Sequence, residues 1–166
     1  MDVIKYAMQM ELDGVKFYEQ AARAAPDKLR EIFEHLADEE RRHFKFFYSL
    51  SEGQTDKARK NLISDSLGES KNIFVQMIEQ NAQTEFSDEV REVWRQAREI
   101  EEKAVAMYTD EAEKENNVTR KDLLWKIAEE ERRHIYLIEN VLSFLIDPQG
   151  FAASQQYASF KSAEGH

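Results

Sequence analysis

One pentapeptide, Glu-Glu-Arg-Arg-His, occurs twice in the chain, at 39–43 and again at 130–134. Both copies lie in segments where apolar residues recur every three or four positions, as on one face of an amphipathic helix. In each copy a glutamate precedes the histidine by three residues (Glu40 and His43, Glu131 and His134), so both side chains project from the same helical face. The chain must therefore fold so that two helices present the same pair of polar groups.

Four long helices are predicted. The first two cover about 2–25 and 27–51, the third runs from the capping signal at 87–89 to about 116, and the fourth from after Thr119 to before Pro148. Asp27 is the expected N-cap of the second helix, and Thr119 with Asp122 is the expected capping pair of the fourth. A composition with 34% charged residues and only 5 glycines and 2 prolines also favours long helices, and hence an all-α fold.

A glutamate interrupts the apolar stripe of every helix, and the four positions correspond between the two halves of the chain. Glu11 and Glu40 are 29 residues apart, and Glu101 and Glu131 are 30 apart. Within each antiparallel pair the two glutamates lie at nearly the same distance from the connecting turn, to within roughly 5 Å at 1.5 Å per residue. We therefore expect all four carboxylates and both imidazoles to meet in one layer of a four-helix bundle.

The bundle is expected to span residues 1–148, with a crossover at about 52–86 and a C-terminal tail at 149–166. For the two pairs to face each other at mid-height, the second and third helices must run parallel, so the crossover has to travel roughly 35 Å along the bundle. A short helix is predicted at 72–80. The crossover can instead reach a second subunit and form a helix-swapped dimer. For the tail, docking through Phe151, Tyr157 and Phe160 and a mobile state both stay open.

Buried carboxylates that lack partners cost several kcal/mol each, so four of them in one layer require cations or protons. Carboxylate ligands with one imidazole per metal, in a chain without cysteine, suit two iron or manganese ions, with zinc as a substitute. The predicted metal ligands are Glu11, Glu40, His43, Glu101, Glu131 and His134. In this arrangement Glu40 and Glu131 bridge the ions. Tyr18 and Tyr108, each seven residues after a ligand, either hydrogen-bond a ligand carboxylate or fill the core.

The remaining residues of the repeated pentapeptide are expected at the surface. Glu39 and Glu130 are rotated about 100° from the ligand face, and the four arginines are expected to lie on solvated helix faces. His35 and His166 are interpreted as ordinary histidines, because neither belongs to the repeat.

Charge and hydropathy exclude several functions. A net charge of −10 offers no basic excess for nucleic acid. The longest strongly apolar stretch, 135–146, is short and interrupted by Glu139 and Asn140, so no membrane span is expected. The first residues do not have the pattern of a signal peptide, and a cytoplasmic protein is the default expectation.

These motifs resemble the ferritin-like superfamily, and within it the rubrerythrin-type di-iron proteins. The likeness rests on segments 36–43 and 127–134, together with the Glu11–Tyr18 and Glu101–Tyr108 pairs, and covers about residues 2–147. It implies a four-helix bundle with a non-haem di-iron centre that reduces hydrogen peroxide or dioxygen, as a defence against oxidative stress. Rubrerythrins also carry a four-cysteine rubredoxin-like domain. Since this sequence contains no cysteine, the resemblance implies a separate electron donor such as rubredoxin.

Rubrerythrins have a further glutamate one turn from the third-helix ligand, whereas this chain has Arg98 and Ala104 at those positions. A more symmetric, oxidase-like centre is therefore an alternative to a peroxidase. Ferroxidase activity with iron storage or iron handling is the second alternative, and a metal-free interaction bundle is the third. A homodimer is expected for the peroxidase or oxidase, and a many-subunit cage for storage.

Overall fold

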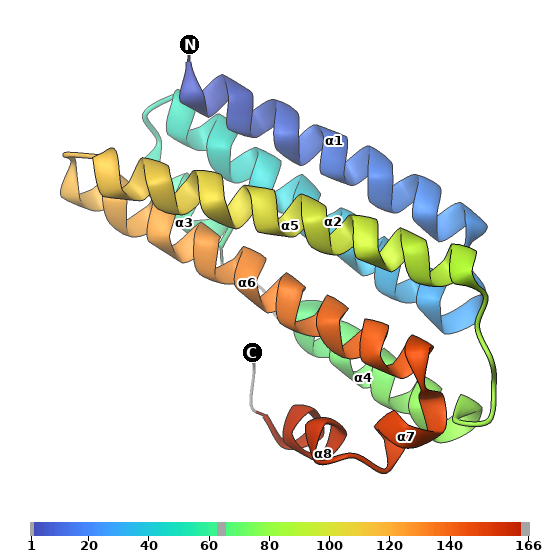
Figure 1. The fold of residues 1–166 in the computed structure, drawn as a ribbon. Coiled ribbons are helices and arrows are strands. Elements are labelled where there is room, and N and C mark those ends of the chain that lie inside the picture. Colours follow the sequence, from blue (N-terminus) through green and yellow to red (C-terminus); the bar gives the residue numbers. More distant parts are fainter. Residues whose placement is uncertain (1, 63–65, 164–166) are drawn as a thin grey trace.

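The long helices form two antiparallel hairpins (Figure 1). In the computed structural model, which describes residues 2–62 and 66–163, α1 (Val3–Ala24) is followed by α2 (Asp27–Ser51), and α5 (Asp88–Lys114) by α6 (Val118–Ile146). The colours in Figure 1 show that α2 and α5 run in the same direction along the bundle. The predicted all-α bundle, with two hairpins joined by a long crossover, is confirmed.

The crossover contains two helices, α3 (Thr55–Lys60) and α4 (Ser66–Asn81). The second of these includes the predicted helix at 72–80 but begins earlier. It packs against α2 and α6, where Phe74, Met77 and Ile78 are buried. Residues 63–65 of the predicted crossover lie outside the described residues. Helix α4 of the crossover therefore adds apolar side chains to the core in one half of the bundle.

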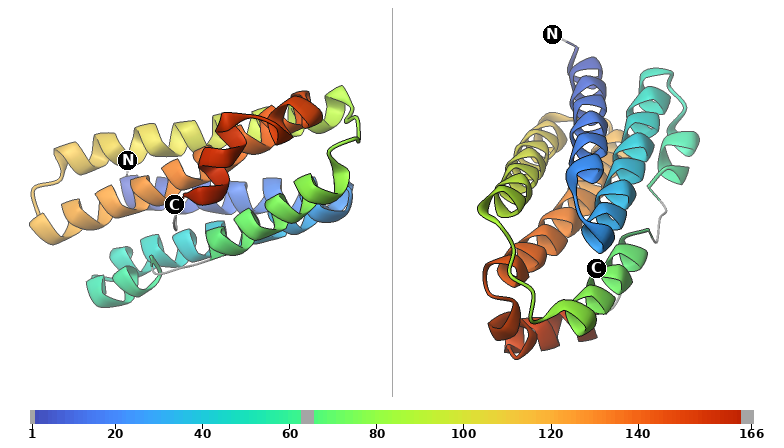
Figure 2. Two further views of the ribbon diagram at one scale, coloured as in Figure 1. Left: turned by 90° about the horizontal axis from the view of Figure 1, so that it is seen from below. Right: turned by 90° about the vertical axis from the view of Figure 1, so that its right-hand side faces the viewer.

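The C-terminal segment folds into α7 (Pro148–Ala152) and α8 (Gln155–Ser162), which pack beside α4 and the C-terminal half of α6 (Figure 2). Its aromatic side chains are buried, and the Phe74 ring lies 6.0 Å from that of Phe151 and 5.5 Å from that of Phe160. Of the two states that the sequence leaves open, the structure shows the docked one up to residue 163. His166 lies outside the described residues.

Two predicted helix caps are wrong. Asp27 is the first residue of α2 and follows Pro26 at the N-cap, which makes no side-chain hydrogen bond. Instead, Arg30 Nε donates to the carbonyl oxygens of Ala22 and Ala25, at 3.1 and 3.3 Å, and so satisfies the end of α1. The N-cap of α6 is Asn117, whose side chain accepts a hydrogen bond from the Arg120 amide, so Thr119 and Asp122 lie inside the helix. Both caps depend on local turn geometry, which several candidate residues fit equally well.

The apolar core is divided into two clusters along the bundle. One contains 29–37 of α2 and 137–145 of α6 among its segments, and the other contains 46–50 of α2 and 123–128 of α6. The polar residues of the repeat lie between these segments in both helices. Helix packing thus places a polar layer at the middle of the bundle, with apolar side chains above and below it.

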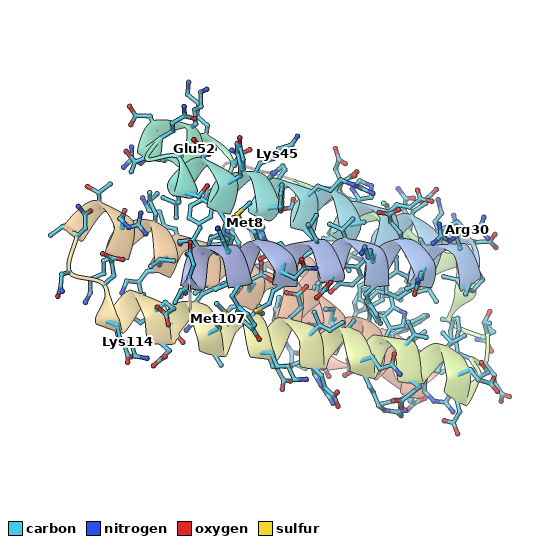
Figure 3. All side chains as sticks on the ribbon, turned by 90° about the horizontal axis from the view of Figure 1, so that it is seen from above. Met8, Arg30, Lys45, Glu52, Met107 and Lys114 are labelled. Atoms are coloured by element: carbon cyan, nitrogen blue, oxygen red, sulfur yellow. The ribbon has the colours of Figure 1, made fainter. Side chains whose placement is uncertain are left out.

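Charged side chains cover the outside of the bundle. Seen from the side of α1, with α2 and α5 on either side of it, Lys45 and Lys114 project away from the helices (Figure 3). None of the described helices combines the length and the apolarity of a segment that crosses a bilayer.

Candidate metal centre

The structure brings all six predicted ligands together inside the bundle. Glu11, Glu40, Glu101 and Glu131 come from the four long helices, and each has at most 3% of its surface exposed. His43 and His134 follow their glutamates by one turn, are equally buried, and face each other with ring centroids 5.6 Å apart. The layer that the sequence predicts from matched positions in the two hairpins is therefore present.

The ligand atoms form two groups that overlap. One consists of Glu11, Glu40, His43 and Glu131, and the other of Glu40, Glu101, Glu131 and His134. Within each group, one atom from every residue lies within 4.8 Å of the others. Glu40 and Glu131 belong to both groups. If each group held one cation, each cation would have its own glutamate and histidine, and Glu40 and Glu131 would be available to both.

Both histidines turn Nδ1 towards these carboxylates. His134 Nδ1 lies 3.3 Å from Glu101 Oε1, 3.4 Å from Glu40 Oε1 and 3.6 Å from Glu131 Oε2. His43 Nδ1 is in contact with Glu131 Oε1. The same nitrogen of both rings thus points to the centre of the layer.

The two tyrosines hydrogen-bond carboxylates across the bundle. The Tyr18 hydroxyl, from α1, donates to Glu101 Oε1 of α5 at 2.6 Å, and the Tyr108 hydroxyl, from α5, donates to Glu11 Oε1 of α1. The sequence leaves open whether these tyrosines bond a ligand carboxylate or only fill the core, and the structure shows the hydrogen bonds for both. Each bond fixes one carboxylate oxygen and joins the two hairpins.

Burial and crowding shift the acidities of these groups in the metal-free protein. Burial, with the charges of Glu101 and Glu131, raises the pKa of Glu40 to about 7. Burial and Glu101 raise the pKa of Glu131 to about 8. Burial, the largest single effect, acts to raise the pKa of Glu101, but the charge of His134 together with hydrogen bonds from Glu131, His134 and Tyr18 outweighs it and lowers this pKa to about 2. The layer is therefore a place where protons or cations must balance closely spaced negative charges.

Several buried atoms in the layer lack a hydrogen-bond partner among the described residues. They are Oε2 of Glu11, Oε1 of Glu40, Oε2 of Glu101 and Oε2 of Glu131. Buried polar atoms are normally satisfied, so a set of orphaned acceptors pointing into one space indicates a missing cationic partner. Oxygen and imidazole donors without sulfur fit iron or manganese, and zinc as a substitute.

The prediction that Glu39 and Glu130 lie at the surface is wrong. Both are buried, with 4% and 6% exposed. Arg42 Nη2 lies 3.1 Å from Glu39 Oε2 and 3.6 Å from Glu130 Oε1, and is itself only partly exposed. Glu130 Oε2 is also 3.2 Å from His43 Nε2. The prediction treated each helix alone, whereas contacts between α2 and α6 bury the face that carries these residues.

Sequence reasoning therefore missed a role for Glu130 and Arg42. With a proton on Nε2, His43 donates to Glu130 and leaves Nδ1 for the centre, which is how carboxylates orient metal-bound histidines. The duplicated glutamate in Glu-Glu-Arg-Arg-His was the available signal. Arg41 and Arg132 differ from Arg42, because they are exposed and pair with Asp38 and Glu129, whereas Arg133 is partly buried.

Arg98, Ala104 and His35 lie outside the two ligand groups. Arg98 pairs with Glu102 at 3.5 Å on the outside of α5, and Ala104 is buried among apolar residues. His35 is partly buried, with Nδ1 3.4 Å from Glu69 Oε2. None of the three adds a ligand to the centre.

A comparison with protein families matches one family model, described as rubrerythrin, over residues 2–142. The match includes all six clustered ligands and both tyrosines. Neither the curated proteins nor the solved structures yield a match.

Proposed function

Because the chain belongs to the rubrerythrin family, we propose that it is a non-haem di-iron oxidoreductase that reduces hydrogen peroxide or dioxygen. The observation that carries the proposal is the pair of overlapping ligand groups, which share Glu40 and Glu131 and contain orphaned donor atoms. When bound, an iron pair supplies electrons and Lewis acidity for cleavage of an O–O bond. Residues 1–166 contain no cysteine for a rubredoxin-type centre, so the proposed electron donor is a redox centre outside this segment, such as rubredoxin.

The protein's own groups prepare the site for two cations. Tyr18 and Tyr108 hold a hydroxyl proton at Oε1 of Glu101 and of Glu11, and leave Oε2 of each carboxylate without a hydrogen bond to a described residue. Glu130 Oε2 likewise lies 3.2 Å from His43 Nε2, which leaves His43 Nδ1 directed at the centre of the layer. Glu11, Glu101 and His43 are thus each fixed at one atom and available at another, which pre-organises this part of the layer at little entropic cost.

The buried position controls access of water. Apolar side chains lie on both sides of the layer, and no ligand exposes more than 3% of its surface. Such burial favours small oxidants such as peroxide or dioxygen over larger substrates. Reduction of one hydrogen peroxide molecule to two water molecules consumes two electrons and two protons, and a two-iron centre matches that electron count.

The test begins with anaerobic loading of the protein with Fe(II). Two iron ions per chain are expected, followed by oxidation on addition of peroxide or dioxygen and turnover with reduced rubredoxin. Absence of iron oxidation by either oxidant refutes the proposal. Glu40→Ala combined with Glu131→Ala is expected to abolish binding of both ions, while the matched surface pair Glu99→Ala and Glu113→Ala retains it. Size-exclusion chromatography separates the expected homodimer from a storage cage.

A further inference from the structure

Gly14 lies in the middle of α1, three residues after Glu11 and on the same helical face. It is buried against Glu40 of α2. A Cβ atom added to Gly14 would lie 3.1 Å from Glu40 Oε2 and 3.5 Å from both Cγ and Cδ of the same side chain, and these are its three nearest neighbours. A contact of 3.1 Å is closer than ordinary van der Waals contact, so the Glu40 carboxylate would have to move.

Glycine is a poor residue for the interior of a helix, because it loses more backbone entropy than alanine when the helix forms. The helical Gly68 of α4 shows the contrast, since a Cβ there would meet nothing within 4 Å. The repeat shows a second contrast: the position three residues after Glu101 is Ala104. The absence of a side chain at position 14 is thus specific to the α1 side of the centre, where Glu40 lies.

We propose that Gly14 is a positioning residue, whose missing Cβ keeps free the space that the Glu40 carboxylate occupies when it lies between two metal ions. The inference rests on the proposed function, because it takes the shared carboxylates as metal ligands. Glu40 belongs to both ligand groups, so a shift of its carboxylate disturbs both ions.

The two states of the protein respond oppositely to a methyl group at position 14. Without metal, a shift of a few tenths of an ångström at the flexible end of the Glu40 side chain accommodates the methyl group, and alanine improves the helix. With metal, the ions hold the carboxylate in place, and the methyl group meets it. Gly14→Ala therefore stabilises the metal-free protein and weakens metal binding.

The experiment compares Gly14→Ala with the matched helical control Gly68→Ala. Melting is measured with a chelator present, and Fe(II) binding is measured anaerobically by titration calorimetry with metal analysis. Both variants are expected to melt about 2–4 °C above the wild type without metal. Gly14→Ala is expected to bind Fe(II) about tenfold to a hundredfold more weakly, and Gly68→Ala with unchanged affinity.

A second background tests whether Gly14 acts through Glu40. In Glu40→Asp the carboxylate is one methylene shorter, so the oxygen that would lie 3.1 Å from a Cβ at position 14 is withdrawn, and adding Gly14→Ala to it should cost little further Fe(II) affinity. Equal losses in the two backgrounds, or an unfolded Gly14→Ala/Glu40→Asp protein, would show that the glycine serves helix packing and would overturn the inference.

The outcomes also separate this inference from the proposed function. If the wild type binds two Fe(II) and Gly14→Ala binds them equally tightly, the positioning role is refuted while the metal centre stands. If the wild type binds no Fe(II), the metal centre itself is refuted.

Discussion

Glu40→Gln should stabilise the protein when no metal is bound, although it removes a predicted metal ligand. Glu40 is 3% exposed, and burial together with the charges of Glu101 and Glu131 raises its pKa from 4.5 to about 7. Glutamine has nearly the same shape but no charge. The substitution therefore removes the cost of an ionised carboxylate in this layer and leaves the packing largely unchanged.

The sign and the size of the effect depend on pH. With a pKa raised on folding, the folded protein binds more protons than the unfolded chain, so this contribution to stability is complete below pH 4.5 and is lost as the pH rises through 7. The shift from 4.5 to about 7 corresponds to roughly 3 kcal/mol. Glu40→Gln should thus raise the free energy of unfolding by up to about 3 kcal/mol at pH 8, and by less than about 1 kcal/mol at pH 5.

Differential scanning calorimetry with a chelator, at pH 5 and at pH 8, measures this difference. For a chain of 166 residues, about 3 kcal/mol corresponds to a rise in Tm of roughly 6–12 °C. Glu99→Gln, which removes the same charge from an exposed position of α5, is the control and should change Tm little at either pH. A second scan after addition of Fe(II) should show a large metal-dependent rise in Tm for the wild type and a much smaller one for Glu40→Gln.

An equal change in Tm at pH 5 and pH 8 would refute this reasoning, because it would show that the effect does not come from the charge. Loss of stability at pH 8 would also refute it. In that case the ionised Glu40 would contribute more through its contact with His134 than it costs by burial.

Three further predictions concern neighbouring features. Fe(II) affinity should rise with pH between 6 and 8, because Glu40 and Glu131, with pKa values of about 7 and about 8, must lose protons before they bind a cation. Titration calorimetry in buffers of different ionisation enthalpy counts the protons that are released on binding. Tyr18→Phe should cost about 1–3 kcal/mol in urea unfolding by removing the buried hydrogen bond to Glu101, whereas Tyr48→Phe, at a half-exposed position, should be neutral. Asn117→Ala should cost about 1 kcal/mol in the same assay through loss of the α6 cap, and an unchanged midpoint would contradict the assigned cap.

Much of the centre was predictable from the sequence because its ligands are encoded locally. Glu40 with His43, and Glu131 with His134, are one helical turn apart, so any helix that includes them presents both side chains together. Matched distances from two turns then place Glu11 and Glu101 at the same height. The overlap of the two groups at Glu40 and Glu131 follows from this layout.

Other features required contacts between helices. The burial of Glu39 and Glu130 depends on α2 and α6 facing each other, and one helical stripe does not contain that information. The same holds for Gly14, whose space is filled by a side chain from the neighbouring helix. Caps were the least predictable, since Asp27 and Thr119 suit the role chemically but Pro26 and Asn117 occupy it.

Residue spacing along the chain already specifies four long helices, each with a glutamate on its apolar face, and a histidine on the same face of two of them. Periodicity and spacing along a helix are local properties, which is why they can be read without a fold. Helix packing is needed to specify which hydroxyl fixes which carboxylate, which charge orients His43, and that the C-terminal aromatic residues pack against α4. Those pairings join residues far apart in the chain, and they exist only after the helices have packed.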